Sequence, residues 1–599
     1  MCPGLVDQSN GVHEESPSTA QTDSNPKTHA QEMKSLMSAF AHHGKPLRGL
    51  MSTPKSVSFE GRFGRMFTLP QARYGEPEEK SRKALKALGD VGAMTAGFDA
   101  PKDGIDGEES GIPALYTYFG QFIDHDITFD PMSTLQKHFD PNALTDFRTP
   151  ALDLDNVYGR GPDDQPYLYD GTGLQFELGK ALKNGAHDLP RNGGARARAL
   201  IGDPRNDENS IISQLQGLML QFHNRVAADH PHLNHPSDFH ELQRIVRWHY
   251  QWVIAYDFLP RIISEDVLKS LKTDARYDQS KICYFKWRNN PFMPVEFSAA
   301  AYRLGHSMIR PGYRLNEDDA TLLPIFPVKK KDDPDGHPAF PNGLTGFTAM
   351  EDNRGIDWKL FIDIGPERSN GTDPDKDPNN PDNKKRLQFA YKLDPSIVNP
   401  LSELPTTVAS DDPQSLAQRN LLRGFELGLP SGQAVAKKMG VTYTRSDGKT
   451  FTGPLTDDDI WISKNGDDPK DATMADRIKN DSTKDKLWAG FKGNCPLWTY
   501  ILAEAAFIQR NAKDAKGDEG FEVVIPVKEA TPVGTPQLGP VGGRIVAEVF
   551  LGLLFGDKSS FFTCDPHWTP TIFGKGAGFK LKDIVAYALG DMTAPPRTA

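Results

Sequence analysis

The chain has 599 residues, of which 37% are hydrophobic, and its formal net charge is −11. This length and apolar content allow a large folded core. The negative charge disfavours a nucleic-acid partner or an anionic membrane surface. The absence of any run of about eighteen apolar residues disfavours a membrane span.

The N-terminal region, residues 1–55, is predicted to be a disordered tail, and residues 56–599 to form one folded domain. The tail is polar and has neither the basic start nor the apolar stretch of a classical signal peptide. The expected location is therefore the cytoplasm or, for export, a leaderless route. Four cysteines without metal-like spacing indicate a fold that does not depend on crosslinks. The sequence leaves the oligomeric state open.

Apolar residues recur at three- and four-residue intervals in several segments, which predicts helices. The first covers residues 113–127, with Pro113 at the first helical position. Further helices are expected at 211–228, 241–258, 264–272, 298–309, 415–425, 433–439, 497–512 and 542–555. Segments 328–342, 365–385 and 443–490 are rich in Asp, Lys, Pro and Gly and are expected to be irregular loops. The prediction is a mainly α fold, one large domain with few short strands and long loops, which could hold a flat cofactor between helices.

The segment 120–129, G-Q-F-I-D-H-D-I-T-F, concentrates polar groups on an apolar helix. Gln121 lies four residues before His125, so both side chains can point into one cavity. Asp124 and Asp126 fan out on either side. Taken alone, a buried histidine between two solvated aspartates explains the segment equally well.

A second segment, 149–155, alternates Thr149, Ala151, Asp153 and Asp155. In an extended loop these residues offer a hydroxyl, a backbone carbonyl and two carboxylates to one side. Such hard oxygen ligands suit Ca²⁺, and Asp126 could complete the shell. For the loop alone, an Asp-rich turn is the favoured interpretation.

Two further segments carry charged or imidazole groups. Residues 201–209 contain Arg205 and Glu208 before a strong helix, where Asp207 or Asn209 could also act as the helix cap. Residues 296–311 contain His306 beside the small residues Ala299, Ala300, Ala301 and Gly305, which would leave room for a large planar ligand. The alternative is a core histidine hydrogen-bonded to a carbonyl.

The segments together suggest a haem bound by one histidine and facing another. The second histidine would take a proton from hydrogen peroxide and return it to the departing oxygen, while an arginine stabilises charge. Spacing alone does not fix which histidine binds iron.

In this order, and with P-V-G-G-R-I-V-A-E-V-F-L-G-L-L at 540–554, the segments resemble those of the animal-type haem peroxidases of the peroxidase–cyclooxygenase superfamily, in particular bacterial members. The resemblance spans roughly residues 59–592. It implies an enzyme that reduces hydrogen peroxide through a ferryl intermediate and oxidises halides, pseudohalides or small aromatic donors, in a response to oxidative stress.

The resemblance also implies roles for single residues. His125 would be the distal histidine with Gln121 as its companion, Arg205 the distal arginine, and His306 the iron ligand. Asp124 and Glu208 would form ester links to haem b. The implied calcium ligands are Asp126, Thr149, the Ala151 carbonyl, Asp153 and Asp155.

A fifth segment, N-L-L-R-G-F-E-L-G-L-P at 420–430, enters through the resemblance alone. Asn420 matches the asparagine that hydrogen-bonds the iron-ligating histidine. Arg423 and Arg303 match arginines near the haem propionates. A neutral amide beside the axial histidine would give it less imidazolate character than a carboxylate would.

Two departures bear on the substrate. Asn209 follows Glu208 where the mammalian myeloid enzyme has a methionine that forms a sulfonium link, so chloride oxidation is not expected. Arg303 stands three residues before His306, where the fatty-acid oxygenases have a radical-forming tyrosine. Tyr302 is one position off and, on an α-helix, should point away from the haem. A fatty-acid dioxygenase and a non-catalytic haem-binding module remain the alternatives to a peroxidase.

Overall fold

The computed structural model describes residues 61–590 except for 97–102, 105, 130–144, 147, 195–196, 289–290, 318–320, 327–342, 365–367, 370–376, 378, 406–408, 410, 463–472, 512–521, 524–526 and 529–532. The predicted tail lies outside the described residues. Within them, helices dominate and every strand has five residues or fewer. The prediction of a mainly α fold with few short strands is therefore confirmed.

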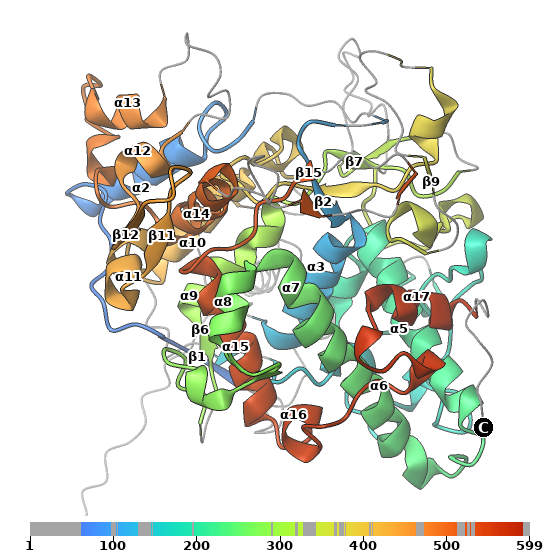
Figure 1. The fold of residues 1–599 in the computed structure, drawn as a ribbon. Helices are drawn as coiled ribbons and strands as arrows, with labels where there is room; N and C mark the ends of the chain where they lie inside the picture. Colours follow the sequence, from blue (N-terminus) through green and yellow to red (C-terminus); the bar gives the residue numbers. More distant parts are fainter. Residues whose placement is uncertain are drawn as a thin grey trace, which may run out of the picture.

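The longer helices surround the centre of the described fold (Figure 1). They are α2 (Glu78–Gly89), α3 (Leu115–Ile127), α5 (Ser210–Asp229), α6 (Phe239–Val253), α10 (Leu416–Glu426), α11 (Gly432–Met439), α14 (Leu497–Asn511), α15 (Gly542–Gly556) and α17 (Leu581–Ala588). Shorter ones are α4 (Asp155–Tyr158), α7 (Leu259–Ile262), α8 (Glu265–Ser270), α9 (Val295–Ser298), α12 (Asp457–Ile460), α13 (Met474–Lys479) and α16 (Phe561–Cys564).

The strands form small sheets between the helices. β1 (Gly61–Gly64) pairs with β3 (Thr145–Asp146) in antiparallel and with β6 (Met293–Pro294) in parallel orientation. The remaining pairs are β2 (Glu109–Pro113) with β10 (Phe389–Tyr391), β4 (Lys272–Thr273) with β5 (Arg276–Tyr277), β7 (Gly312–Tyr313) with β8 (Leu323–Pro324), β9 (Arg368–Ser369) with β14 (Val527–Lys528), β11 (Thr442–Thr444) with β12 (Thr450–Thr452), and β13 (Glu522–Val523) with β15 (Val533–Gly534).

Helix α3 lies near the centre of the molecule and packs against α4, α5 and β10 (Figure 1). Its apolar stripe, which includes Phe119 and Phe122, is completely buried. The helix begins at Leu115 and not at Pro113 as predicted, because Pro113 belongs to β2 and pairs with Phe389 of β10. It ends where Thr128 turns extended and donates its N–H to the Asp124 carbonyl at 2.9 Å.

The segment predicted to be one helix over residues 298–309 is divided. Helix α9 ends at Ser298, Ala300 has a non-helical backbone (φ −136°, ψ −74°), and a 3₁₀ helix, η9, covers Ala301–His306. A 3₁₀ helix repeats every three residues, so Arg303 and His306 share one face. Because tertiary packing and not periodicity determines this geometry, the α-helical prediction for this segment is wrong.

Two other segments differ from prediction. The helix expected over 241–258 ends at Val253 and passes through a π-helical turn, η7 (Ile254–Phe258), into α7. The segment 443–490 was expected to be irregular, but it contains the β11–β12 hairpin and helices α12 and α13. The hairpin turns at Gly448, whose positive φ of 82° suits glycine, and Thr456 and Thr473 form capping boxes for α12 and α13.

The apolar core of the described residues is essentially one cluster, which runs from Phe63 to Tyr587 in sequence. Helices α5, α6 and α17 pack together on one side of α3, and α2, α10 and α14 on the other (Figure 1). None of the described helices is long and apolar enough to cross a membrane.

Candidate functional site

A cavity lies between α3 and η9 and encloses about 1560 Å³ of space, including its open mouth. Most of its wall is apolar and aromatic. The predicted site residues that line it are Gln121, Asp124, His125, Glu208, Arg303 and His306.

His125 is completely buried in the wall that α3 contributes. Its Nδ1 lies 2.7 Å from the side-chain oxygen of Asn206. One turn earlier, the Gln121 amide donates a hydrogen bond to Glu208. Asn206 was missed by the sequence reasoning, because it is 81 residues from His125 and no spacing rule joins the two. Its position beside Arg205 was the only available signal.

Arg205 is buried behind His125 and is not among the residues that line the cavity. Its Nη2 donates to the His125 carbonyl at 2.9 Å, and Nε and Nη2 donate to Asp203. Its guanidinium lies over the Phe129 ring at 4.6 Å. Burial raises the pKa of Asp203, but the guanidiniums of Arg148 and Arg205 outweigh burial and hold that pKa well below its usual range. Arg205 therefore supports the backbone of His125 in this arrangement.

The two carboxylates predicted to form ester links both face the cavity. Asp124 accepts from the Thr128 hydroxyl at 2.9 Å, and burial raises its pKa against the opposing charges of Arg205 and Arg303. Burial raises the pKa of Glu208 to about 8, again against the opposing charge of Arg205. At neutral pH Glu208 is therefore mostly a protonated acid within an apolar wall.

His306 lines the cavity from η9, and its Nδ1 lies 2.6 Å from the side-chain nitrogen of Asn420 on α10. The Asn420 oxygen accepts from Arg303 Nη1 at 3.2 Å. In this orientation the amide donates to Nδ1, which places the imidazole proton on Nε2. Iron binding through Nε2 would require the amide to turn, so that its oxygen accepts from Nδ1–H.

Of the remaining predicted residues, some line the cavity and others do not. Arg423 lies on α10 one turn after Asn420 and is not among the cavity-lining residues. Of the four small residues before His306, only Gly305 lines the cavity; the three alanines are in the core. Asn209 caps α5 by accepting from the backbone N–H groups of Ile211 and Ile212, so the capping prediction is confirmed for it. Asp207 is paired with Arg191.

Tyr302 does line the cavity, contrary to the expectation that it points away. Its hydroxyl donates to the Gly120 carbonyl at 3.1 Å, and its ring stacks on Phe297 at 4.7 Å. The expectation assumed that only the helix face of His306 meets the cavity, whereas every residue of η9 from Tyr302 to His306 lines it.

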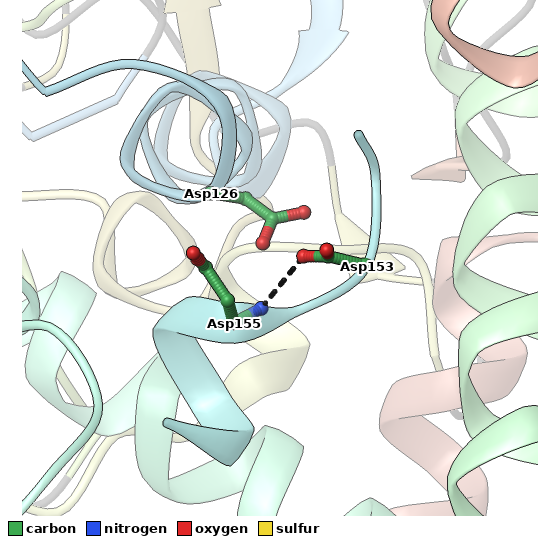
Figure 2. A group of neighbouring side chains, drawn as sticks. All are labelled: Asp126, Asp153 and Asp155. Atoms are coloured by element: carbon green, nitrogen blue, oxygen red, sulfur yellow. Dashed lines mark hydrogen bonds between the residues drawn. The ribbon is translucent and has the colours of Figure 1, made fainter. Parts of the chain in front are cut away.

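Three predicted cation ligands come together beside α3. The carboxylates of Asp126, Asp153 and Asp155 point toward one another, with ligand atoms within 4.8 Å (Figure 2). Leu154 has a left-handed backbone (φ 61°), which turns the loop so that both of its neighbours face Asp126. Thr149 donates its hydroxyl to Asp153 at 2.8 Å. Ala151 is partly buried in the same loop, two residues before Asp153.

The chemistry of this cluster fits a divalent cation. Asp126 and Asp155 are buried, and Oδ1 of each has no hydrogen-bond partner among the described residues. Burial, then repulsion from the other two aspartates, raises the pKa of Asp126; burial raises that of Asp155 to about 7. Buried carboxylates so close together are costly unless a positive charge joins them. Arg148 supplies part of that charge, with Nη1 at 3.3 Å from Asp155.

Comparisons with known proteins show which family this chain resembles. Residues 136–331 match the animal haem peroxidase family. The chain is 32% identical over 308 residues to a peroxidasin homolog of Mus musculus, an alignment that covers 48% of this chain and 18% of that protein. It is 26% identical over 223 residues to thyroid peroxidase of Rattus norvegicus, covering 34% and 23% of the two chains. The alignments thus span less than a quarter of either relative.

The fold resembles that of peroxidase A from Dictyostelium discoideum, with a TM-score of 0.50 and 16% identity over 83% of this chain and 89% of that one. Residues 136–331 of this chain are therefore similar to animal haem peroxidases, and the described fold is similar to that of a solved peroxidase.

Proposed function

We propose that this protein is a haem peroxidase that reduces hydrogen peroxide and oxidises halides, pseudohalides or small aromatic donors. The observation that carries the proposal is the pair of histidines, one from α3 and one from η9, that line a single large apolar cavity. Haem b bound there would supply the iron centre at which the peroxide bond is cleaved. The match of residues 136–331 to the animal haem peroxidase family and the imidazole pair both fit that group.

The chain's own residues divide the work. His306 would hold the iron, with Asn420 setting its orientation. His125 would take a proton from peroxide at Nε2 and return it to the departing oxygen. Gln121 and the cavity wall would orient the peroxide. Arg205 supports His125 from behind and would have to extend its guanidinium toward the cavity to stabilise charge directly.

Ester links at Asp124 and Glu208 form part of the proposal, because both carboxyl groups face the cavity. Extraction of the loaded protein with acidified ketone should leave haem on the wild-type chain. Asp124→Asn with Glu208→Gln should release all of it. Full release from the wild type would show that the haem is held without covalent links.

The donor is proposed to be iodide, thiocyanate or an aromatic compound and not chloride. Asn209 stands where a sulfonium-forming methionine would be, and its oxygen is already engaged in capping α5. Comparable turnover of chloride and bromide at neutral pH would contradict this part of the proposal.

A fatty-acid dioxygenase is the second candidate, because Tyr302 lines the cavity. The Tyr302 hydroxyl donates to the Gly120 carbonyl, and burial raises its pKa well above the usual value. A radical at Tyr302 would therefore need another group to accept the hydroxyl proton. Incubation with linoleate under oxygen distinguishes the two functions. Rapid regiospecific oxygenation that is lost in Tyr302→Phe would favour the dioxygenase.

The decisive experiment is an absorption spectrum of the haem-loaded protein before and after peroxide. A Soret band that shifts on adding peroxide is expected for the wild type. His306→Ala should bind haem much more weakly, whereas His240→Ala, a substitution of an exposed histidine, should behave as wild type. A properly loaded protein whose spectrum ignores peroxide would refute the proposal.

A further inference from the structure

His125 is the first member of a series of buried hydrogen-bonded groups that leads back to its own helix, α3. Its Nδ1 contacts Asn206 at 2.7 Å, the Asn206 amide nitrogen donates to Gln216 at 2.8 Å, and the Gln216 nitrogen approaches the Asn156 carbonyl at 3.5 Å. The Asn156 side chain then donates to the Phe122 carbonyl at 3.1 Å. This series of contacts thus begins and ends on α3, and its side chains are completely buried.

The donor-to-acceptor direction of these hydrogen bonds determines which nitrogen of His125 carries the proton. A backbone carbonyl can only accept, so the Gln216 nitrogen must face Asn156. The Gln216 oxygen then faces the Asn206 nitrogen, and the Asn206 oxygen faces His125. If the side-chain amides were turned the other way, the Gln216 oxygen would face the backbone carbonyl oxygen of Asn156, and neither atom could donate a hydrogen bond. His125 Nδ1 is therefore the donor, and Nε2 carries the lone pair.

We propose that Asn206 is a positioning residue that holds His125 as the Nδ1–H tautomer, so that Nε2 serves as the proton acceptor in the cavity. The inference rests on the proposed function. In the step it supports, one proton moves from a bound peroxide oxygen to Nε2, while Nδ1 keeps its own proton. Partners that orient a metal-bound imidazole commonly contribute 10- to 100-fold, and we expect an effect of the same order at His125.

The test uses cyanide, because hydrogen cyanide must give up its proton to bind the iron, and carbon monoxide, which has no proton to give. In haem-loaded Asn206→Leu, cyanide binding followed at the Soret band should slow about 10- to 100-fold. Carbon monoxide binding to the reduced protein should stay within about twofold. Asn206→Asp keeps an oxygen acceptor and should recover most of the cyanide rate. Asn316→Leu removes another buried asparagine and should leave both rates unchanged.

Cyanide binding at the wild-type rate in Asn206→Leu would overturn the inference, as would an equal slowing of carbon monoxide, since that would indicate a general structural defect. If Asn206→Leu does not fold, Gln216→Met releases the Asn206 amide and should slow cyanide several-fold with the same contrast to carbon monoxide. A wild-type protein without a Soret band would instead refute the proposed function.

Discussion

His125 is restrained from three directions at the scale of single side chains. Asn206 holds its ring, Arg205 holds its carbonyl, and the neighbouring Asp126 belongs to the cation cluster. Because the ring cannot turn without breaking a buried hydrogen bond, its cavity-facing nitrogen is fixed in advance. Such preorganisation is what a proton-transfer residue needs.

Replacement of His125 tests its proposed role directly. His125→Gln should lower the rate constant for the reaction with peroxide about 10²- to 10⁴-fold, the usual contribution of a positioned acid–base group. Haem content should stay near that of the wild type, because His306 is proposed to bind the iron. Stopped-flow absorption measures both quantities. A loss of less than about threefold would contradict the assignment.

Glu208 should make the stability of the haem-free protein depend on pH. Its pKa is raised by burial to about 8, above the value of an exposed glutamate, so between those values the folded state binds more protons than the unfolded state. Its contribution is present below the unfolded pKa and is lost as pH rises toward 8. The slope is at most about 1.4 kcal/mol per pH unit. Urea unfolding from pH 5 to 9 should show a shallower decline for Glu208→Gln than for the wild type.

At the scale of secondary-structure elements, the cluster of Asp126, Asp153 and Asp155 joins α3 to the loop before α4 (Figure 2). Arg148 extends this link, because it contacts both Asp155 and Asp203, and Asp203 in turn holds Arg205. A cation at the cluster would therefore stabilise the end of α3 and, through two ion pairs, the arginine behind His125.

Removal of calcium should lower the thermal stability. Saturating Ca²⁺ at about 100 times its Kd contributes about 2.7 kcal/mol relative to the free state. We expect chelation to lower the Tm of the wild type by several degrees and readdition of Ca²⁺ to restore it. Asp153→Asn should abolish the response, whereas Asp163→Asn, a change of an exposed aspartate, should keep it. A wild-type Tm that changes with neither chelator nor Ca²⁺ would contradict the cation site.

At the scale of the whole molecule, the cavity is assembled from distant parts of the chain. α3, the segment around Glu208, η9 and α10 all contribute to it, and one apolar cluster connects them. We therefore propose that residues 56–599 form a single haem peroxidase domain, with the polar N-terminal segment outside it.

Deletion of residues 1–55 tests this boundary. The shortened chain should keep the Tm within about 2 °C of the full chain, because a polar, predicted disordered segment buries little apolar surface. The Soret band and the peroxide reaction should be unchanged. Differential scanning calorimetry of both chains measures the difference. A large fall in Tm or loss of haem would place part of the segment inside the domain.

The sequence alone determined the elements whose cause is local. The periodicity of apolar residues predicted α3, α5, α10, α14 and α15 to within a few residues at each end. The alternating acids at 153 and 155, with Asp126, predicted a cluster that the structure brings together. The helices and the shared side of residues 153 and 155 follow from spacing along one helix or one loop, where neighbours in sequence are neighbours in space. Asp126 lies on α3 and meets the two loop aspartates only in the folded structure.

Tertiary structure decided the rest. The 3₁₀ geometry of η9, the placement of Tyr302 in the cavity wall and the position of Arg205 behind His125 depend on packing between segments far apart in sequence. Asn206 gained its contact with His125 in the same way, across 81 residues. A buried polar group must find its partner wherever the fold provides one, and no local pattern in the chain encodes that choice.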